Sequence, residues 1–283
     1  MRLRTLPLSL SGIVAGVALA STVMHLEFDT VLTLILTASF LQILSNLSNE
    51  LGDTLHGTDT ADRQGIHYSI MDGEMTVPQM KRLIAVIICL CCVSGLLMVL
   101  FSFRGHLLQS CLFILLGAAT IWAAMHYTLG KNPYGYRGLG DIFVFIFFGL
   151  VSTLGAGYIC SHSFDPLWLL PASAIGCLSV GVLNVNNIRD MKTDAATRTT
   201  VALMLGLKRA RIYQTILISL GWVLMLTFTL LNSSSFLFAV TLPLFIIHLR
   251  GVWTREERRL DPMLPLLVMS TFVMSIIFAV GLA

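Results

Sequence analysis

Nine long apolar runs, separated by short polar stretches, follow one another along this chain of 283 residues. A helix needs about 20 apolar residues to cross the hydrocarbon core of a bilayer, and most of the runs approach that length. The runs are continuously apolar, whereas a membrane β-strand alternates apolar and polar positions, so helices are favoured over a barrel. The pattern predicts an all-α integral membrane protein with nine transmembrane helices, at Leu6–Met24, Thr30–Ser48, Leu83–Phe103, Leu107–Thr128, Asp141–Ile159, Leu167–Asn187, Ile212–Leu231, Ser235–Leu249 and Leu264–Leu282.

The composition agrees with a membrane protein. Hydrophobic residues make up 56% of the chain and charged residues only 12%, whereas soluble domains carry about 25% charged residues. Six cysteines lie in or beside apolar runs without a C-x-x-C spacing, so neither a zinc site nor a disulfide framework is expected. No low-complexity linker interrupts the sequence, and we expect one polytopic membrane domain over residues 1–283.

Charged residues are distributed unevenly between the two sides of this membrane topology. The N-terminus and the loops after the second, fourth, sixth and eighth helices share one side and hold 17 of the 18 Lys and Arg residues, Arg104 being the exception. The positive-inside rule makes that side cytoplasmic, with the C-terminus across the cell (inner) membrane. Of the 15 Asp and Glu residues, 12 are also cytoplasmic. This side is therefore expected to handle a charged ligand, and no basic tail indicates nucleic-acid binding.

The first acid cluster comes at the end of the second predicted helix. If the helix continues through it, Asn49 and Asp53 are four residues apart and share one face, with Asn46 a turn earlier. Amide and carboxylate oxygens suit a hard cation such as Mg²⁺ better than zinc. Taken alone, the cluster is equally typical of a solvated polar loop that ends a helix.

A second cluster repeats this spacing after the sixth predicted helix. Asp190 and Asp194 are four residues apart, and Asn186 and Asn187 precede them by about one turn. Two such pairs on the same membrane side could hold two divalent cations between them, and those cations could grip a diphosphate. Cations interleaved with the cluster would add charge-assisted hydrogen bonds to phosphate oxygens; they are Arg189, Lys192 and Arg198.

A third polar segment, residues 125–141, follows the fourth predicted helix on the same side. It contains Tyr127 and Lys131, four residues apart, and Arg137, among glycines and a proline that favour a tight turn. Lys131 and Arg137 could reach an anion. An aromatic and basic interfacial belt would show the same residues, so the position beside the two acid clusters is what favours a binding site.

Together these segments resemble the three signature regions of the UbiA superfamily of intramembrane aromatic prenyltransferases. The matching residues are Asn49-Glu50-Leu51-Gly52-Asp53, Tyr127 with Lys131, and Asn187-Ile188-Arg189-Asp190 with Asp194. Within the superfamily, Gly57-Thr58-Asp59 with Arg63, and Tyr136-Arg137-Gly138-Leu139-Gly140-Asp141, are most similar to the branch that prenylates 1,4-dihydroxy-2-naphthoate in menaquinone biosynthesis. The chain departs from the usual pattern at Glu50, where the family has Asp, and at Thr197-Arg198, where it commonly has Gly-Lys.

The resemblance implies a nine-helix bundle whose active site lies at the cytoplasmic helix ends. A polyprenyl group would pass from polyprenyl diphosphate to 1,4-dihydroxy-2-naphthoate with loss of CO₂ and diphosphate, with the substrate's tail against membrane lipid and Mg²⁺, in two ions, as cofactor. The implied metal ligands are Asn49, Asp53, Asn187, Asp190 and Asp194, with Glu50 and Asp59 as further candidates. The implied catalytic residues are Asp53, Asp190, Asp194, Tyr127 and Lys131. The residues implied for the diphosphate or the aryl carboxylate are Arg63, Lys131, Arg137, Arg189 and Arg198.

Two alternatives stay open at this point. The acceptor could be another aromatic compound, such as 4-hydroxybenzoate or homogentisate. A cation-coupled transporter would also use oxygen-rich helix breaks, but transporter sites typically lie near the bilayer midplane, and the acids here lie at helix ends. Neither the prenyl chain length nor the oligomeric state follows from the sequence.

Overall fold

The computed structural model describes residues 5–57, 70 and 73–283, and within these ranges the chain is helical apart from turns and a single isolated β-bridge. Two of the candidate site residues, Asp59 and Arg63, lie outside the described residues. In chain order the elements are α1 (Leu6–Ser21), α2 (Phe28–Leu55), α3 (Val77–Ser102), α4 (Leu107–His126), the 3-10 helix η2 (Tyr134–Tyr136), α5 (Gly140–Val144), the π-helix η3 (Phe145–Val151), α6 (Ser152–Ser161), η4 (Pro166–Trp168), α7 (Leu169–Arg189), α8 (Met191–Asp194), α9 (Val201–Leu205), α10 (Leu207–Leu231), η5 (Leu237–Thr241), α11 (Leu242–Thr254), η6 (Glu257–Leu260) and α12 (Met263–Leu282).

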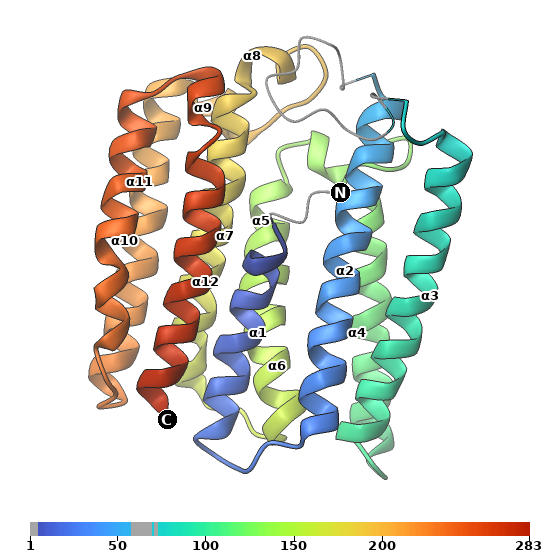
Figure 1. The fold of residues 1–283 in the computed structure, drawn as a ribbon, viewed down its shortest axis with the longest axis vertical. Coiled ribbons are helices and arrows are strands. Elements are labelled where there is room, and N and C mark those ends of the chain that lie inside the picture. Colours follow the sequence, from blue (N-terminus) through green and yellow to red (C-terminus); the bar gives the residue numbers. More distant parts are fainter. Residues whose placement is uncertain (1–4, 58–69, 71–72) are drawn as a thin grey trace.

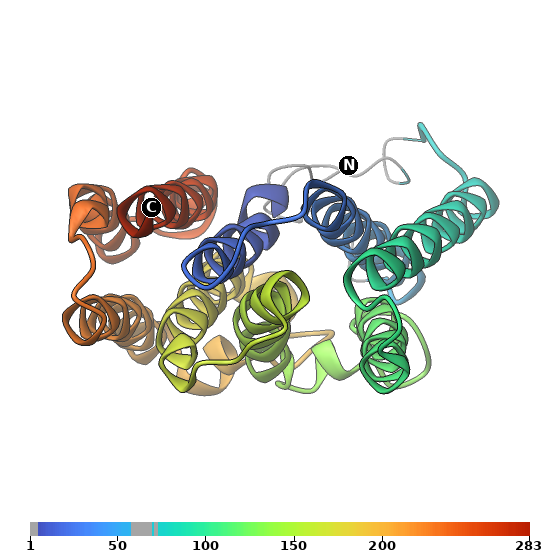
Figure 2. The same ribbon diagram turned by 90° about the horizontal axis from the view of Figure 1, so that it is seen from below.

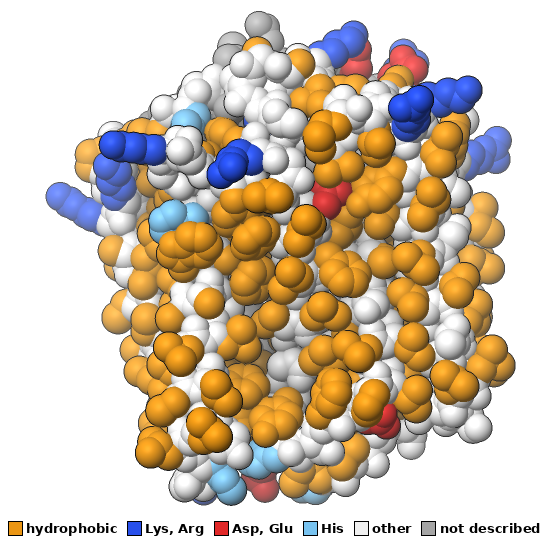
Figure 3. Space-filling view, turned by 180° about the vertical axis from the view of Figure 1, so that it is seen from behind, with side chains coloured by type: hydrophobic (Ala, Val, Ile, Leu, Met, Phe, Trp, Pro, Cys, Tyr) orange, Lys and Arg blue, Asp and Glu red, His pale blue; other side chains and the backbone are white. Residues whose placement is uncertain are grey.

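The predicted all-helical membrane architecture is confirmed. Eight helical segments of the described chain are long and apolar enough to cross a membrane, and α1 is a shorter apolar helix of 16 residues. These nine segments correspond to the nine predicted runs. Apolar side chains cover the middle of the molecule, whereas Lys and Arg gather toward one end, the end at which α8 lies (Figures 1 and 3). The protein is a multi-pass membrane protein.

Several predicted boundaries were wrong at the basic end of the molecule. Helix α2 continues to Leu55 instead of ending at Ser48, so the first acid cluster is helical. Helix α10 begins at Leu207 instead of Ile212, and α11 continues past Leu249 to Thr254. The added turns of α10 and α11 carry Lys208, Arg209 and Arg250, whose long side chains can reach water from a helix end, whereas the added turns of α2 carry the acid cluster. Hydrophobicity therefore marked the membrane-crossing part of each helix and not its full length.

The helices form an elongated bundle when seen along their axes (Figure 2). Helices α3 and α4 lie at one edge, α10 and α11 lie at the other, and α1 and α7 lie between them. Helix α7 belongs to the most buried of the eight spans. This central position brings the C-terminal end of α7, which carries the second acid cluster, into the same part of the molecule as the C-terminal end of α2.

Small residues allow the helices to approach closely, as two examples show. Gly12 and Gly16 on α1 face α6, and a Cβ on Gly16 would lie 2.2 Å from the carbonyl oxygen of Thr153. Gly149 on η3 packs against Gly176 on α7, where its Cβ would lie 2.5 Å from the Gly176 Cα. Pairs of small residues are a common means of helix association in membranes, where backbone contact replaces the hydrophobic effect.

Candidate active site

A cavity of about 340 Å³ lies inside the bundle and extends from the acid clusters into the apolar interior. Its walls come from α1, α2, α4, the span made of α5, η3 and α6, and α7. Along α2 the lining changes from Leu34 and Leu41 to Asn49 and Asp53, so the polar end of the cavity lies at the C-terminal end of this helix. The cavity therefore offers a charged head region continuous with a long apolar chamber.

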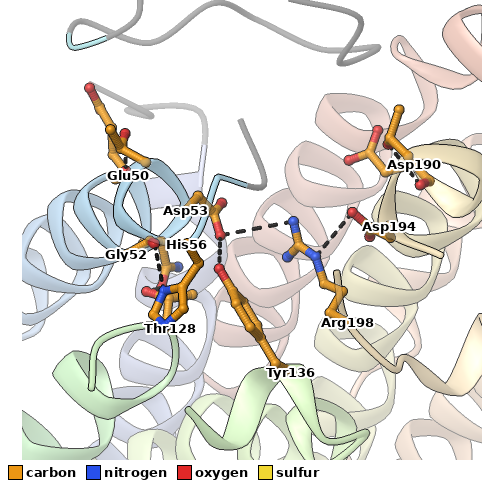
Figure 4. A network of polar contacts seen from close by, with 12 residues as sticks. Glu50, Gly52, Asp53, His56, Thr128, Tyr136, Asp190, Asp194 and Arg198 are labelled. Atoms are coloured by element: carbon orange, nitrogen blue, oxygen red, sulfur yellow. Dashed lines mark hydrogen bonds and ion pairs between the residues drawn. The ribbon is translucent and has the colours of Figure 1, made fainter. Parts of the chain in front are cut away.

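The first acid cluster presents two of its members to this cavity. Asn49 and Asp53 both line it, as their spacing of one helical turn on α2 predicts. The Asp53 Oδ1 atom accepts a hydrogen bond of 2.7 Å from the Tyr136 hydroxyl. The Glu50 side chain points away from Asp53 (Figure 4). Its Oε1 atom accepts a hydrogen bond from the backbone N–H of Ile70. Asn49 and Asp53 are thus on the cavity wall, whereas Glu50 is not part of its lining.

The segment after α4 is held closely against α2 at this cluster. The Thr128 hydroxyl lies 2.9 Å from the carbonyl oxygen of Ser48 and 3.2 Å from the Asn49 Oδ1 atom. The approach requires a glycine, because a Cβ on Gly52 would lie 2.5 Å from the Thr128 Oγ1 atom. Gly52 lies within α2, and its observed role is close contact with Thr128.

The second acid cluster is organised by a buried arginine. Arg189 donates from Nε and Nη2 to the two carboxylate oxygens of Asp190, over 2.8 and 2.6 Å. Its Nη1 group donates to Asp261 over 2.7 Å, and Nη2 also donates to Asn186. Asp190 and Arg189 are both buried. The cation predicted to assist a diphosphate is thus engaged by an adjacent carboxylate and by the segment before α12.

Helical geometry continues past the end of α7, as the spacing of the second cluster predicts. The backbone N–H of Asp194 donates to the carbonyl oxygen of Asp190 over 2.8 Å. Among the residues that the structure describes, Asn186 and Asn187 line the cavity, and Asp190 and Asp194 do not. The amides of α7 therefore face the chamber more directly than the carboxylates that follow them.

Arg198 connects the two clusters. Its guanidinium lies between two carboxylates, with Nε 3.0 Å from Asp194 Oδ1 and Nη2 3.9 Å from Asp53 Oδ1 (Figure 4). It also lies over the ring of Tyr136, 5.2 Å from the centroid, and it lines the cavity. Among the described residues, the buried Nη2 group has no hydrogen-bond partner. A buried donor of this kind favours an anionic ligand in the cavity.

Electrostatics keep Arg198 charged. Burial by itself lowers the pKa of the Arg198 guanidinium, but the carboxylates of Asp53 and Asp194 outweigh burial and raise that pKa. Burial raises the pKa of the Tyr127 phenol to about 12, although the nearby Arg198 opposes the shift. The head region therefore contains a permanent cation and a phenol that stays protonated, and both groups can donate hydrogen bonds.

The third polar segment divides into buried and exposed parts. Tyr127 lines the cavity, whereas Lys131 and Arg137 are exposed. The backbone of Arg137 forms the isolated bridge with Thr199, and the Thr199 N–H donates to the carbonyl oxygen of Tyr136. The segment is thus attached to the Arg198 loop through its backbone.

Three further residues that organise the site were not among the predicted site residues. Tyr136 contacts both Asp53 and Arg198, Thr128 contacts α2, and Asp261 holds Arg189. Tyr136 stands within a quoted motif, but no spacing rule relates it to Asp53, 83 residues earlier. Asp261 lies in the loop region before α12 and carries no motif signal.

The donor atoms at the head of the cavity fit Mg²⁺. Among the described residues, no group of three or more His, Cys, Asp and Glu side chains converges as an all-protein metal cage. Mg²⁺ is usually held by one or two carboxylates together with waters and substrate phosphates. The hard oxygens of Asn49, Asp53 and Asn187 on the cavity wall match that requirement.

These features define a class: a polytopic helical membrane protein with an oxygen-rich head region above an apolar chamber. The UbiA prenyltransferase family model matches residues 9–279. The chain therefore belongs to the UbiA prenyltransferase family.

Two curated relatives are similar to this chain over nearly their full length, and a third over a shorter part. The 1,4-dihydroxy-2-naphthoate octaprenyltransferase of Escherichia coli (strain K12) is 37% identical over 288 residues, which cover 100% of this chain and 93% of that protein. The protein of the same name from Haemophilus influenzae (strain ATCC 51907 / DSM 11121 / KW20 / Rd) is 35% identical, covering 99% and 93%. A UbiA prenyltransferase domain-containing protein 1 from Dictyostelium discoideum is 31% identical and covers 72% of this chain and 62% of its own length.

Solved structures share the fold. The apo structure of a UbiA homolog from Aeropyrum pernix K1 superimposes with a TM-score of 0.70 at 15% identity, covering 96% of this chain and 98% of that one. A UbiA homolog from Archaeoglobus fulgidus, solved bound to DMAPP and Mg²⁺, gives a TM-score of 0.61 at 14% identity, with the same coverage of both chains. At these identities the similarity establishes the fold alone.

Proposed function

We propose that this protein transfers a polyprenyl group from polyprenyl diphosphate to 1,4-dihydroxy-2-naphthoate, with Mg²⁺ as cofactor and with release of diphosphate and CO₂. The observation that carries the proposal is the cavity, whose polar head at Asn49, Asp53 and Arg198 opens into an apolar chamber. A prenyl diphosphate has the same division into a charged head and an apolar tail. The relatives named for the naphthoate reaction support the choice of acceptor.

The head of the donor would lie among the oxygen ligands and Arg198. In this proposal Asn49, Asp53, Asn187, Asp190 and Asp194 would hold two Mg²⁺ ions, and the ions would supply positive charge against the negative charge of the diphosphate. The carboxylates of Asp53 and Asp194 keep Arg198 charged, and its buried Nη2 group is placed to donate to a phosphate oxygen. Lys131 and Arg137 are exposed, so they are assigned to capture of an anionic substrate at the entrance.

Apolar side chains would exclude water while the allylic carbon is electron-deficient. The lining includes Phe143, Phe147 and Phe148 from the α5–η3 span, together with Tyr127 and Tyr134. In the reaction, the C–O bond to diphosphate breaks and the naphthalene ring carbon that bears the carboxylate attacks the allylic carbon. The bond between this ring carbon and the carboxylate then breaks, CO₂ leaves, and the bonding electrons return to the ring. Before the attack, aromatic faces can stabilise the positive charge on the allylic carbon.

The proposed orientation places this reaction at the cytoplasmic side of the cell (inner) membrane, with the N-terminus on that side and the C-terminus across it. The gathering of Lys and Arg at the α8 end supports it through the positive-inside rule (Figure 3).

The test is a reconstitution with defined substrates. The purified protein in detergent, with Mg²⁺ and a polyprenyl diphosphate, is incubated with 1,4-dihydroxy-2-naphthoate, 4-hydroxybenzoate or homogentisate, and products are identified by mass together with CO₂ release. We expect a decarboxylated prenyl naphthalenediol. A naphthoate product that retains its carboxylate, or turnover with another acceptor only, would refute the proposal, and so would Mg²⁺ transport without any prenyl transfer.

A further inference from the structure

Polar side chains of α2 line the cavity at a greater depth than the first acid cluster. Gln42 and Asn46 lie on the same face of α2 as Asn49, because positions 42, 46 and 49 follow the four- and three-residue spacing of a helix. All three residues line the cavity. Gln42 lies seven residues before Asn49, which is about 10 Å along a helix axis. The polar wall of α2 therefore extends about two turns deeper than the proposed metal site.

Two neighbours fix the orientation of the Gln42 amide. Its Nε2 group donates to the Thr5 Oγ1 atom over 2.8 Å and to the Asn46 Oδ1 atom over 3.2 Å. Thr5 and Asn46 are joined as well, because the Asn46 Nδ2 group donates to the Thr5 Oγ1 atom over 3.1 Å. The Gln42 side chain is buried, with only 5% of its surface exposed. Both N–H groups of this amide are therefore used inside the protein, and rotation of the amide would break both hydrogen bonds.

The other polar atom of Gln42, Oε1, has no hydrogen-bond partner in the described part of the chain, where both hydrogen bonds of this side chain use Nε2. A carbonyl oxygen only accepts hydrogen bonds, so its partner must carry an O–H or N–H group. A diphosphate bound to metal ions and an ionised carboxylate offer only acceptor oxygens, and a prenyl tail offers no polar atom. The chemistry that matches this oxygen is therefore a hydroxyl group.

A second polar side chain lies at a similar depth, on α7. Ser179 lines the cavity, and its buried hydroxyl has no hydrogen-bond partner among the described residues. It lies eight residues before Asn187, about 12 Å along a helix axis. Helices α2 and α7 both run toward the basic end of the molecule, so the two depths can be compared (Figure 1). Two walls of the chamber thus carry polar groups at a level where an apolar tail would leave them unsatisfied.

We propose that Gln42 recognises the aromatic acceptor, with its Oε1 atom accepting a hydrogen bond from a phenolic hydroxyl, while Thr5 and Asn46 hold the amide in place. This inference rests on the proposed function, because it assigns the acceptor subsite of that reaction. In 1,4-dihydroxy-2-naphthoate the 1-hydroxyl adjoins the carboxylate and can donate to it, whereas the 4-hydroxyl has no such neighbour. The 4-hydroxyl is therefore assigned to Gln42. The edge of the ring that carries the carboxylate then faces the head of the cavity, where the allylic carbon would lie.

Binding of two matched ligands tests this assignment without any turnover. The affinities of 1,4-dihydroxy-2-naphthoate and of 1-hydroxy-2-naphthoate, which lacks the 4-hydroxyl, are measured by anaerobic titration calorimetry on the protein in detergent. Wild type should bind the dihydroxy compound about tenfold more tightly, the effect of one hydrogen bond to a buried acceptor. Gln42→Leu should bind both compounds equally, since the partner of the 4-hydroxyl is gone. Loss of the hydroxyl and loss of the amide are then non-additive, as expected for groups in contact.

A matched control comes from Thr37, which lines the same chamber on α2 but donates its hydroxyl to the carbonyl oxygen of Thr33 in its own helix. Thr37→Val should keep the tenfold preference of wild type. Thr5→Val, which frees one N–H group of the Gln42 amide, should reduce the preference to a few-fold and so provides a second variant if Gln42→Leu does not fold. The assignment is overturned if wild type binds both compounds equally or binds neither, or if Gln42→Leu keeps the preference.

Steady-state kinetics separate this inference from the proposed function. In Gln42→Leu the KM for 1,4-dihydroxy-2-naphthoate should rise about tenfold, while the KM for polyprenyl diphosphate stays that of wild type. If wild type prenylates the naphthoate and both KM values are unchanged in Gln42→Leu, the role of Gln42 is refuted and the reaction stands. If wild type uses 4-hydroxybenzoate instead, the naphthoate proposal fails, and 4-hydroxybenzoate with benzoate becomes the matched pair. A hydroxyl preference that disappears in Gln42→Leu would then still support Gln42, and one that persists would refute it.

Discussion

The acid clusters on α2 and at the end of α7 look alike in sequence, but the fold uses them differently. On α2, Asp53 faces the cavity, accepts a hydrogen bond from the Tyr136 hydroxyl and lies 3.9 Å from the Arg198 guanidinium. After α7, Asp190 is paired through both oxygens with Arg189 and is not among the described residues of the cavity lining. The same one-turn spacing of amide and carboxylate thus places a carboxylate on the cavity wall in one cluster and in a close, two-oxygen contact with a buried arginine in the other.

Because of this difference, we expect a substitution in the first cluster to lower activity more than stability, and a substitution of Asp190 to lower both. Removing Asp53 takes away a contact of 3.9 Å from Arg198, whose Nε keeps its 3.0 Å contact with Asp194, whereas removing Asp190 takes away two contacts of 2.8 and 2.6 Å from Arg189. A carboxylate that satisfies a buried guanidinium cannot be removed so easily, because the remaining charge stays desolvated. The four predictions below test this contrast.

The largest effect is expected for Asp53→Ala. Removing this carboxylate from the head of the cavity should lower kcat for prenyl transfer by about 10³-fold. The proposed Mg²⁺ site would lose one of its ligands, and the charge that builds up on the diphosphate would be stabilised less. The melting temperature should change little. The control is Glu27→Ala, which removes an exposed carboxylate at the opposite end of α2 that makes no cap hydrogen bond. Wild-type turnover by Asp53→Ala would contradict the assignment.

Asp190→Ala should be the most destabilising of these changes. It leaves the Arg189 guanidinium buried with fewer partners, at a cost of about 3 kcal/mol in the free energy of unfolding. Turnover should also be lost. Arg189→Leu combined with Asp190→Leu should recover much of the stability but none of the activity. Thermal unfolding in detergent measures the first effect, and equal losses of stability in Asp53→Ala and Asp190→Ala would remove the contrast between the two clusters.

Gly52→Ala should lower kcat/KM by about tenfold, equivalent to about 1.4 kcal/mol. The new Cβ would lie 2.5 Å from the Thr128 Oγ1 atom, so the segment after α4 must move away from Asn49. Gly95→Ala on α3 is the matched control, because its Cβ would meet only Thr37 at 3.8 Å, an ordinary contact. Unchanged kinetics in Gly52→Ala, measured by steady-state assay, would show that the Thr128 contact does not position the site.

The smallest effect is expected for Tyr136→Phe. It removes the 2.7 Å hydrogen bond to Asp53 but keeps the ring beneath Arg198. A loss of about 1 kcal/mol should appear as a several-fold higher Mg²⁺ concentration at half-maximal activity, with nearly normal kcat at saturating Mg²⁺. Tyr158→Phe, on α6 at the opposite end of the bundle from the acid clusters, should leave the Mg²⁺ dependence unchanged. An identical Mg²⁺ dependence in Tyr136→Phe and wild type would separate Tyr136 from the metal site.

Much of the architecture could be predicted from the sequence, because membrane insertion depends on local hydrophobicity. The nine apolar runs correspond to the helices of the structure, and the one-turn spacing of Asn49 and Asp53 places both on the cavity wall. Helix ends were predicted less well, since backbone hydrogen bonding continues α2 to Leu55 and begins α10 at Leu207.

The arrangement of charges within the site could not be predicted in the same way. A pattern of Asn, Asp and Arg predicts which residues are available but not which of them pair. Arg189 was predicted to serve a ligand, and its observed partners include Asp261, 72 residues away. The orientation of Glu50 toward Ile70 likewise depends on a chain segment 20 residues later.

The sequence by itself determined that the chain crosses the membrane repeatedly, which side carries the charge, and that acids recur at one-turn spacing on that side. These properties follow from side-chain transfer energies and helical periodicity, which act over a few residues. Only the tertiary structure decided that Asp53 faces the cavity, that Asp190 is buried against Arg189, and that Arg198 lies between Asp53 and Asp194. The partner of a buried charge depends on how distant helices pack, and residue spacing along the chain does not predict that packing.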